Sequence, residues 1–261
     1  SLGGGVTTDL IGYVAATWLR GIKLIHIPTT LASMVDASIG GKTAVNLTQG
    51  KNLIGAFHQP NLIVMDTKSL STLNQKEMNS GWAEAIKHSL LFDNNLFEKF
   101  KNHSSELLNK GEPFFTDIIK RSVEIKAEIV SKDEFETGTD RIKLNFGHTI
   151  GHALETATSY NSLLHGEAVS IGMVVASKIS SALSYSDDNL TNEIQNILDE
   201  YNLPTRIPKN IDLDDLYTIA KSDKKVRAGK INWVLLKKIG ESVIVNDVPK
   251  EIVMDSLRSS Q

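Results

Sequence analysis

The chain has 261 residues, enough for one large domain or two modest ones, and its 41% hydrophobic and 23% charged residues predict a folded protein with a core and a polar surface. Its formal net charge of −3 argues against a protein whose main task is to bind nucleic acid or an acidic membrane surface. Disulfides and cysteine metal sites are excluded because there is no cysteine; no signal peptide or apolar run near the roughly 20 residues of a membrane span is visible, so we expect a cytoplasmic protein without a membrane partner.

Residues 1–75 alternate short apolar segments with glycine-rich turns, which predicts an α/β unit. A helix is expected over residues 9–20, capped by Thr8 or Asp9 and closed by Gly21. Strands are expected at residues 24–28 and 61–66, and the second is almost wholly apolar, which suits a strand buried on both faces.

The opening SLGGGV suits a turn from a strand into a helix, with almost nothing before it to form the strand. Either this start is unusual or the chain is a fragment that begins within the domain, and composition does not separate the two. Glycines before a helix can bring a phosphate close to free backbone N–H groups. The G-x-G-x-x-G fingerprint is incomplete because Thr8 occupies the third glycine's position, so a turn that only needs glycine for its backbone angles remains an equal alternative.

The segment between the two strands, residues 38–60, is rich in glycine, lysine and asparagine, and we expect it to be a loop. Lys42 and Lys51 each follow a glycine, which favours an anion pocket over two lysines that only add solubility. The spacing of a P-loop is not met at either lysine.

After Asp66 the pattern changes, and residues 76–261 are predicted to be mainly helical. Strand-like alternation returns only near residues 231–247, where Lys238, Ile239 and Gly240 indicate a hairpin turn. Apolar residues recur at helical spacing in residues 76–92, 113–136, 144–160, 165–183 and 190–203.

Three histidines of the helical half are candidates for metal binding. His148 and His152 are four positions apart, which places them on one face of a helix, and His165 follows in the stretch HGE. Two ordinary histidines on a half-buried helix remain an open alternative. Spacing alone does not choose among the possible ligands, which are His148, His152, His165, Glu84, Glu155 and Glu167.

The segments described so far, taken together, resemble the 3-dehydroquinate synthase family in the family's order from residue 3 to about residue 236. GGKTAVN followed by GKNLIGAF, with NFGHTIGHALE and HGE downstream, is the most specific part. The remaining matching stretches are GGGVTTDL, RGIKLIHIPTTLASMVDASI, DTKSLSTL, GWAEAIKH, DEFETGTDRIKL and DKKVRAGKINWVLL.

The resemblance implies a Rossmann-like NAD-binding domain at residues 1–75, with its N-terminal part missing, followed by an α-helical metal- and substrate-binding domain at residues 76–261. It also implies an active site in the cleft between them and a homodimer. The implied metal ligands of Zn²⁺ (or Co²⁺) are Glu84, His148 and His165, whereas His152 faces the substrate. The pair four residues apart would thus divide into one ligand and one neighbour.

The resemblance also assigns contacts to the cofactor and the substrate. The implied NAD contacts are Gly5, Val6, Thr7, Thr8, Asp9, Thr29, Thr30, Asp36, Lys42, Lys51, Ser69, Leu70, Ser71 and Thr72, and Asp36 also matches a substrate position. The implied substrate and catalytic residues are Lys42, Asn52, Lys87, Lys126, Arg141, Asn145, His152 and Lys224. One extra residue between Gly138 and Arg141 makes Glu136, the expected acidic partner, a weaker match.

The implied reaction converts 3-deoxy-D-arabino-heptulosonate 7-phosphate to 3-dehydroquinate and phosphate, in the shikimate pathway to aromatic amino acids. NAD oxidises one hydroxyl, phosphate is eliminated, the ketone is reduced again, and the opened ring closes as a carbocycle. The alternatives are another sugar-phosphate cyclase, such as 2-deoxy-scyllo-inosose synthase, and a zinc-dependent polyol dehydrogenase. A fragment without activity is a third possibility.

Overall fold

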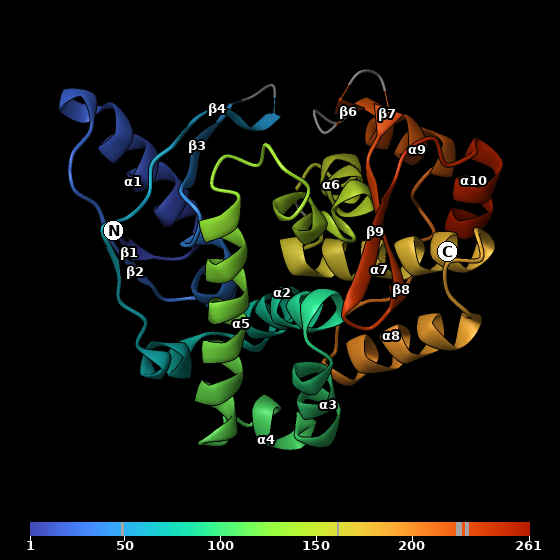
Figure 1. Ribbon diagram of the computed structural model, residues 1–261, viewed down its shortest axis with the longest axis horizontal. Helices are drawn as coiled ribbons and strands as arrows, with labels where there is room; N and C mark the ends of the chain where they lie inside the picture. Colours follow the sequence, from blue (N-terminus) through green and yellow to red (C-terminus); the bar gives the residue numbers. More distant parts are fainter. Residues whose placement is uncertain (48–49, 161, 223–225, 228–229) are drawn as a thin grey trace.

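The computed structural model describes residues 1–47, 50–160, 162–222, 226–227 and 230–261. Figure 1 shows a small α/β part near the N-terminus beside a larger part made mostly of helices. The chain is therefore an α/β protein with a predominantly helical second part, as its apolar periodicity predicts.

A small parallel sheet organises the first part. Strand β2 (Ile25–Pro28) lies between β1 (Leu2–Gly3) and β5 (Leu62–Ile63), and both neighbours run parallel to it. The prediction that residues 61–66 are buried on both faces is wrong, because Leu62 is 51% exposed and Val64 43% exposed. Helix α1 packs against one face of this sheet, whereas Ile25 and Ile27 lie exposed on the other face.

Helix α1 (Gly5–Thr17) starts earlier than the sequence predicts. Its N-cap is Gly4, whose backbone is extended and which has no side chain to cap the helix, and Thr8 lies inside the first turns with its hydroxyl donating to the Gly5 carbonyl. The predicted cap at Thr8 or Asp9 is therefore wrong. The helix ends at Thr17, and a 3₁₀ turn at Trp18–Arg20 leads to Gly21, whose φ of 123° favours glycine.

The predicted loop at residues 38–60 is instead largely an antiparallel hairpin. Strand β3 (Lys42–Leu47) pairs with β4 (Gly50–Phe57) and packs against α1. Alternating residues such as Thr43, which is buried, and Lys42, which is exposed, make the strand pattern, and the many polar residues concealed it in the sequence. Lys42 is thereby held at the start of a strand.

Helix α2 (Gln75–Phe92) is the central helix of the second part, and its residues from Met78 to Leu91 are all buried. It contacts α5, α7 and the π-helical turn Ser33–Ala37 of the first part. The other helices are α3 (Asn94–Asn102), α4 (Ser104–Leu108), α5 (Phe114–Lys132), α6 (His148–Ala157), α7 (His165–Ala182), α8 (Asp188–Glu200), α9 (Leu213–Ser222) and α10 (Lys250–Arg258).

Two helices that carry candidate ligands, α6 and α7, approach each other unusually closely. A Cβ added to Gly172 of α7 would lie 1.9 Å from the carbonyl oxygen of Gly147, and one added to Gly151 of α6 would lie 3.1 Å from the Cα of Val169. Glycines thus allow backbone contact between the helices and fix the distance between the side chains that they present.

Short antiparallel strands complete the second part. Strands β8 (Trp233–Lys238) and β9 (Glu241–Val245) form a hairpin that turns at Gly240 and packs on α7 and α2, and β6 (Val226–Arg227) pairs with β7 (Lys230–Ile231). None of the helices in the described ranges combines the length and apolar character that a membrane crossing requires.

Candidate functional site

The centre of the site is a buried ion pair on α2. Glu84 and Lys87 are one helical turn apart, each side chain is only 1% exposed, and the ammonium of Lys87 donates to Glu84 Oε2. Burial alone would raise the pKa of Glu84, but the Lys87 ammonium lowers it below its usual range. The carboxylate is therefore ionised and its other oxygen, Oε1, is left for another partner.

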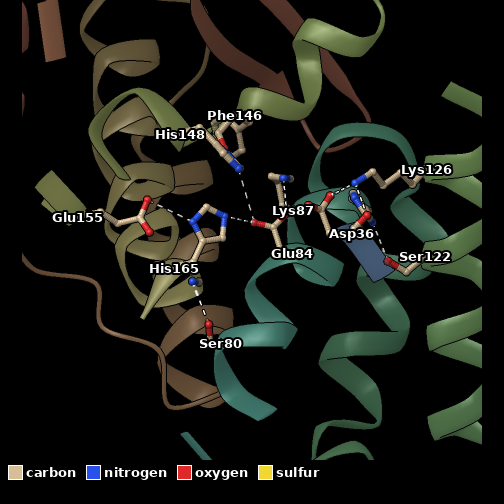
Figure 2. Close-up of polar contacts among 12 residues, drawn as sticks. Asp36, Ser80, Glu84, Lys87, Ser122, Lys126, Phe146, His148, Glu155 and His165 are labelled. Atoms are coloured by element: carbon tan, nitrogen blue, oxygen red, sulfur yellow. Dashed lines mark hydrogen bonds and ion pairs between the residues drawn. The ribbon is translucent and has the colours of Figure 1, made fainter. Parts of the chain in front are cut away.

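Two histidines approach that other oxygen from different helices, as Figure 2 shows. His165 Nε2 of α7 lies 3.3 Å from Glu84 Oε1, and His148 Nε2 of α6 lies 3.7 Å from it. Zinc bonds of about 2.0–2.1 Å at tetrahedral angles would place neighbouring ligand atoms roughly 3.3–3.4 Å apart. The three ligand atoms all lie within 4.8 Å of one another, so their spacing suits one small divalent cation.

The hydrogen bonds around these ligands also suit a metal. Glu84 Oε1 is buried and accepts no hydrogen bond from the described residues. His148 Nδ1 lies 3.1 Å from the Phe146 carbonyl oxygen, which can accept its proton and leave Nε2 as the ligand atom. A buried carboxylate oxygen without a hydrogen bond, facing two imidazole nitrogens, is the arrangement that a bound cation would satisfy.

His165 lies between two carboxylates. Its Nδ1 is 3.4 Å from Glu155 Oε2, on the side away from Glu84. Burial alone would lower the pKa of His165, but contacts with Glu155 and Glu84 raise it to about 9. The ring is therefore strongly attractive to a proton or to a cation at the nitrogen that faces Glu84.

Two further residues that the sequence offered as possible metal ligands, Glu167 and His152, make different contacts. Glu167 accepts the Leu164 N–H at the start of α7 and lies 3.4 Å from Lys76, so it caps the helix instead of joining the three ligands. The His152 ring centroid lies 5.2 Å from that of His148 and 6.0 Å from that of His165. His152 is thus beside Glu84, His148 and His165, the three candidate ligands, and with Glu155 and His165 it forms a second, overlapping group of possible ligand atoms.

A second ion pair lies beside the first, between the buried Lys126 and the partly buried Asp36. Lys126 of α5 donates to the carboxylate and to the backbone carbonyl of Asp36, in the π-helical turn. Burial alone would raise the pKa of Asp36, but Lys126 and Lys87 hold it well below its usual range. The structure thus brings Asp36, Lys87 and Lys126, three residues of the predicted site, close together.

His88 and Ser122 belong to the same buried cluster, and the sequence reasoning missed both. His88 is fully buried, and its Nδ1 lies 2.7 Å from the Ser122 hydroxyl. Burial, with help from Lys87, lowers the pKa of His88 to about 3, so this ring is neutral. Its position directly after Lys87 in the stretch AEAIKH was the available signal.

Lys42 and Asn145 meet at Glu136. The Lys42 ammonium pairs with Glu136 Oε2, and the Asn145 amide donates to Glu136 Oε1 at 3.0 Å. Glu136 thus lies between Lys42 and Asn145, two residues of the predicted site. Lys42 remains 51% exposed, so its ammonium is open to a ligand. Asn52 is also exposed, and its backbone N–H donates to the side-chain oxygen of Asn46.

Arg141 is buried, and its guanidinium donates to the backbone carbonyls of Gly40 and Glu134. It also lies over the ring of Phe57, 5.6 Å from the centroid. These contacts join the first part of the molecule to the segment after α5. Arg141 thus connects the two segments through its guanidinium. An anion that binds Arg141 would have to do so beside these existing contacts.

The predicted cofactor residues gather at the turn into α1. A Cβ added to Gly4 would lie 3.0 Å from Thr30, and one added to Gly3 would lie 2.6 Å from the Thr7 hydroxyl, so the turn's own packing already requires glycine. The Thr29 N–H donates to the Gly3 carbonyl. Val6 is exposed and Asp9 half-buried, and burial together with Asp36 raises the pKa of Asp9 to about 7.

The predicted segment from Ser69 to Thr72 forms a 3₁₀ turn apart from these residues. The Leu70 side chain is fully buried in the core, and the Leu70 carbonyl accepts a hydrogen bond from Lys110. A contact from Leu70 to a ligand would therefore have to involve its backbone. The predicted residue Lys224 and the side chain of Lys51 lie outside the described residues.

Known proteins match this chain along nearly all of its length. The family model described as "3-dehydroquinate synthase N-terminal" matches residues 1–80, and "3-dehydroquinate synthase C-terminal" matches residues 81–226. The 3-dehydroquinate synthase of Rippkaea orientalis is 46% identical over 255 residues, which are 97% of this chain and 69% of that protein.

The chain belongs to the 3-dehydroquinate synthase family. Among solved structures, one similar protein is 2-epi-5-epi-valiolone synthase from Streptomyces hygroscopicus subsp. jinggangensis with NAD+ and Zn2+ bound. It is 30% identical with a TM-score of 0.92, and the match covers 99% of this chain and 72% of the synthase chain. A 2-deoxy-scyllo-inosose synthase complexed with carbaglucose-6-phosphate, NAD+ and Co2+ is 28% identical with a TM-score of 0.87, covering 100% of this chain and 73% of its own. The 3-dehydroquinate synthase family thus shares its fold with other cyclases.

Proposed function

We propose that this chain is a 3-dehydroquinate synthase that converts 3-deoxy-D-arabino-heptulosonate 7-phosphate to 3-dehydroquinate and phosphate. The observation that carries the proposal is the convergence of Glu84, His148 and His165 beside two buried lysines, in a chain of this family. A carbon–oxygen lyase of this kind needs a polarising cation next to positive charges that receive a carboxylate and a phosphate.

Two cofactors complete the proposed site. Glu84, His148 and His165 would hold Zn²⁺ or Co²⁺, whose Lewis acidity lowers the pKa of the substrate hydroxyl that is oxidised. NAD, placed by the turn at Gly5–Asp9 with Thr29 and Thr30, supplies a hydride acceptor that is restored in each turnover. The relatives bound to NAD+ with Zn2+ or Co2+ support both assignments. The remaining proposed cofactor contacts are Asp36, Lys42, Lys51 and the segment Ser69–Thr72.

The proposed substrate site consists of charges that the fold has already arranged. Asp36 holds Lys126, and Glu84 holds Lys87, so both ammonium groups are fixed before a substrate arrives. Fixed charges in a partly buried site cost little reorganisation during the reaction. With Lys42 and Arg141 they would receive the carboxylate and phosphate, while Asn52 and Lys224 complete the proposed contacts.

His152 and Asn145 have roles as hydrogen-bonding groups in the proposal. His152 lies beside both metal-binding histidines and would donate to a substrate hydroxyl or move a proton from it. Asn145 is oriented by Glu136, to which its amide N–H donates, and would contact the substrate from that position. Each of these roles concerns a side chain already held in place by a neighbour.

The proposal extends to organisation. We place the boundary between a Rossmann-like NAD-binding unit and a metal- and substrate-binding unit at residues 75 and 76, where α2 begins. A homodimer and a cytoplasmic location complete the proposal. Light scattering of the purified protein tests the first, and cell fractionation tests the second.

Product analysis tests the proposed reaction. The purified protein, loaded with NAD and Zn²⁺, should release inorganic phosphate from the heptulosonate phosphate without accumulating NADH. Steady NADH formation from a polyol would instead identify a dehydrogenase. Absence of both products from a folded, metal-loaded protein would refute the proposed function.

Another sugar-phosphate cyclase is the second candidate, since the 2-epi-5-epi-valiolone synthase fold matches with a TM-score of 0.92. The 46% identity to a 3-dehydroquinate synthase, against 30% to that cyclase, favours the first candidate. Turnover of glucose 6-phosphate, of which the carbaglucose-6-phosphate in the 2-deoxy-scyllo-inosose synthase complex is a carbocyclic analogue, would favour the second candidate. The decisive comparison is therefore phosphate release from the heptulosonate phosphate and from glucose 6-phosphate side by side.

A further inference from the structure

His165 is held from both sides, and only one of the two neighbours belongs to the proposed metal ligands. Glu84 Oε1 is 3.3 Å from Nε2, and Glu155 Oε2 is 3.4 Å from Nδ1. Figure 2 shows the imidazole between the two carboxylates, with Glu155 on the side away from Glu84. The two ring nitrogens therefore face different partners.

We propose that Glu155 is a positioning residue that keeps the proton of His165 on Nδ1 and so presents the Nε2 lone pair to the metal. This inference rests on the metal site of the proposed function. A neutral imidazole carries one proton, and the nitrogen that binds a metal must be the other one. An ionised carboxylate only accepts hydrogen bonds, so Glu155 at Nδ1 selects this tautomer.

The two histidines reach the same state by different means. His148 Nδ1 is anchored by the Phe146 carbonyl, a neutral acceptor, whereas His165 Nδ1 is anchored by a charged one. A carboxylate partner also makes the imidazole a stronger donor to the metal. His165 needs such a partner more, since its side chain is 39% exposed against 9% for His148, and surrounding packing restricts its ring less.

The position of Glu155 is set by the fold. It lies seven residues after His148 and three after His152, so one face of α6 carries a ligand, its neighbour and the positioning carboxylate. Glu155 is only 4% exposed, and a buried carboxylate needs charged or hydrogen-bonding partners. The close approach of α6 and α7 at Gly151 fixes its distance from His165.

Metal affinity tests the inference directly. Zn²⁺ binding by the wild-type protein, Glu155→Gln and Glu155→Ala is measured by competition with a chromophoric chelator. We expect affinity to fall about 10–100-fold in Glu155→Gln, the typical effect of losing an outer-shell partner, and at least as far in Glu155→Ala. Glu193→Gln, which alters a surface pair with Lys101, is the matched control and should leave affinity unchanged. Circular dichroism of each metal-free variant shows that it is folded.

Two further readouts separate positioning from other roles. In ¹⁵N-histidine NMR spectra of the zinc-loaded wild type, His165 should carry its proton on Nδ1, and the Nδ1 resonance should shift in Glu155→Gln. In the Co²⁺-loaded protein, the same variant should shift the visible absorption bands, because the donor strength of one ligand changes. Glu155→Asp, which keeps the charge, should recover part of the lost affinity.

Each contrary result has a distinct meaning. Unchanged Zn²⁺ affinity in folded Glu155→Gln and Glu155→Ala would overturn the inference and leave the proposed function standing. If Glu155 and His152 instead bind the ion themselves, His148→Ala would retain Zn²⁺ while Glu155→Gln abolished binding, and the inference would again be wrong. A wild-type protein that binds no Zn²⁺ would overturn the metal site and this inference together.

Discussion

The Glu84–Lys87 pair allows one substitution to test stability and metal binding at once. In Glu84→Gln the side chain keeps its shape but loses its charge, so Lys87 remains buried without the carboxylate that it now contacts. In the metal-free protein we therefore expect a large loss of stability, and in the presence of metal we expect weak or no binding.

The magnitude follows from the burial of both side chains, each 1% exposed. Removing one partner of a buried ion pair typically costs about 3–5 kcal/mol. Asp36 is close enough for Lys87 to lower its pKa, and this second carboxylate reduces the loss toward about 3 kcal/mol.

Chemical unfolding of the metal-free protein at pH 7 measures this loss, and the double variant Glu84→Gln/Lys87→Met completes the cycle. Replacing both charges should recover most of the stability, which gives a coupling free energy above about 2 kcal/mol. Glu98→Gln is the control, because Glu98 and Lys101 have the same spacing on α3 but are 46% and 38% exposed, and its effect should stay within about 0.5 kcal/mol. A loss below about 1 kcal/mol for Glu84→Gln, additive with Lys87→Met, would refute the reasoning.

Three further predictions concern the residues around this pair. His152→Ala should keep Zn²⁺, measured by metal analysis, and lose turnover, whereas loss of metal would show that our division of the histidine pair is wrong. The folded-state pKa of Asp9 is raised to about 7, so its protonated carboxyl contributes stability below the unfolded-state pKa, and that contribution is lost as the pH rises toward 7. The variant Asp9→Asn does not ionise, so its free energy of unfolding should rise relative to that of the wild type between about pH 4 and pH 7. The stability difference can be at most roughly 4 kcal/mol, at about 1.4 kcal/mol per pKa unit, and partial exposure reduces it to on the order of 2 kcal/mol. Urea unfolding of the NAD-free protein measures this difference, and parallel pH curves for the two proteins would contradict the prediction. Gly172→Ala should destabilise the protein by about 1–3 kcal/mol and weaken Zn²⁺ binding, because its Cβ would lie 1.9 Å from the Gly147 carbonyl oxygen, next to His148; unchanged stability in the same unfolding experiment would show that the α6–α7 contact can relax freely.

Apolar periodicity was sufficient for the helical part of the fold but not for the small sheet. Helix α2 has a strong apolar pattern because almost every side of it is buried, and the same holds for α7. Strand β5 misled the prediction, because apolar composition indicates burial only when something covers both faces, and Leu62 lies exposed. The β3–β4 hairpin was missed because its alternation is made by polar and small residues.

The proposed metal site shows where reasoning from spacing ends. An i, i+4 pair reports only that His148 and His152 share a face of α6. Which of them faces Glu84 depends on α2, a helix far earlier in the chain, and on the Phe146 carbonyl that orients His148. The resemblance proposed the three residues that the structure brings together, whereas the capping role of Glu167 and the contact of Glu155 with His165 depend on how α7 meets α6.

The two carboxylates that face His165 should differ in what their loss costs. Glu84 is the counter-ion of the buried Lys87, so Glu84→Gln should destabilise the metal-free protein. Glu155 shares His165 with Glu84, which stays 3.3 Å from the ring in Glu155→Gln and still stabilises its protonated form. Glu155→Gln should therefore change metal affinity more than stability. The pair of variants separates a residue that holds the fold together from one that sets the state of a ligand, although both touch the same imidazole.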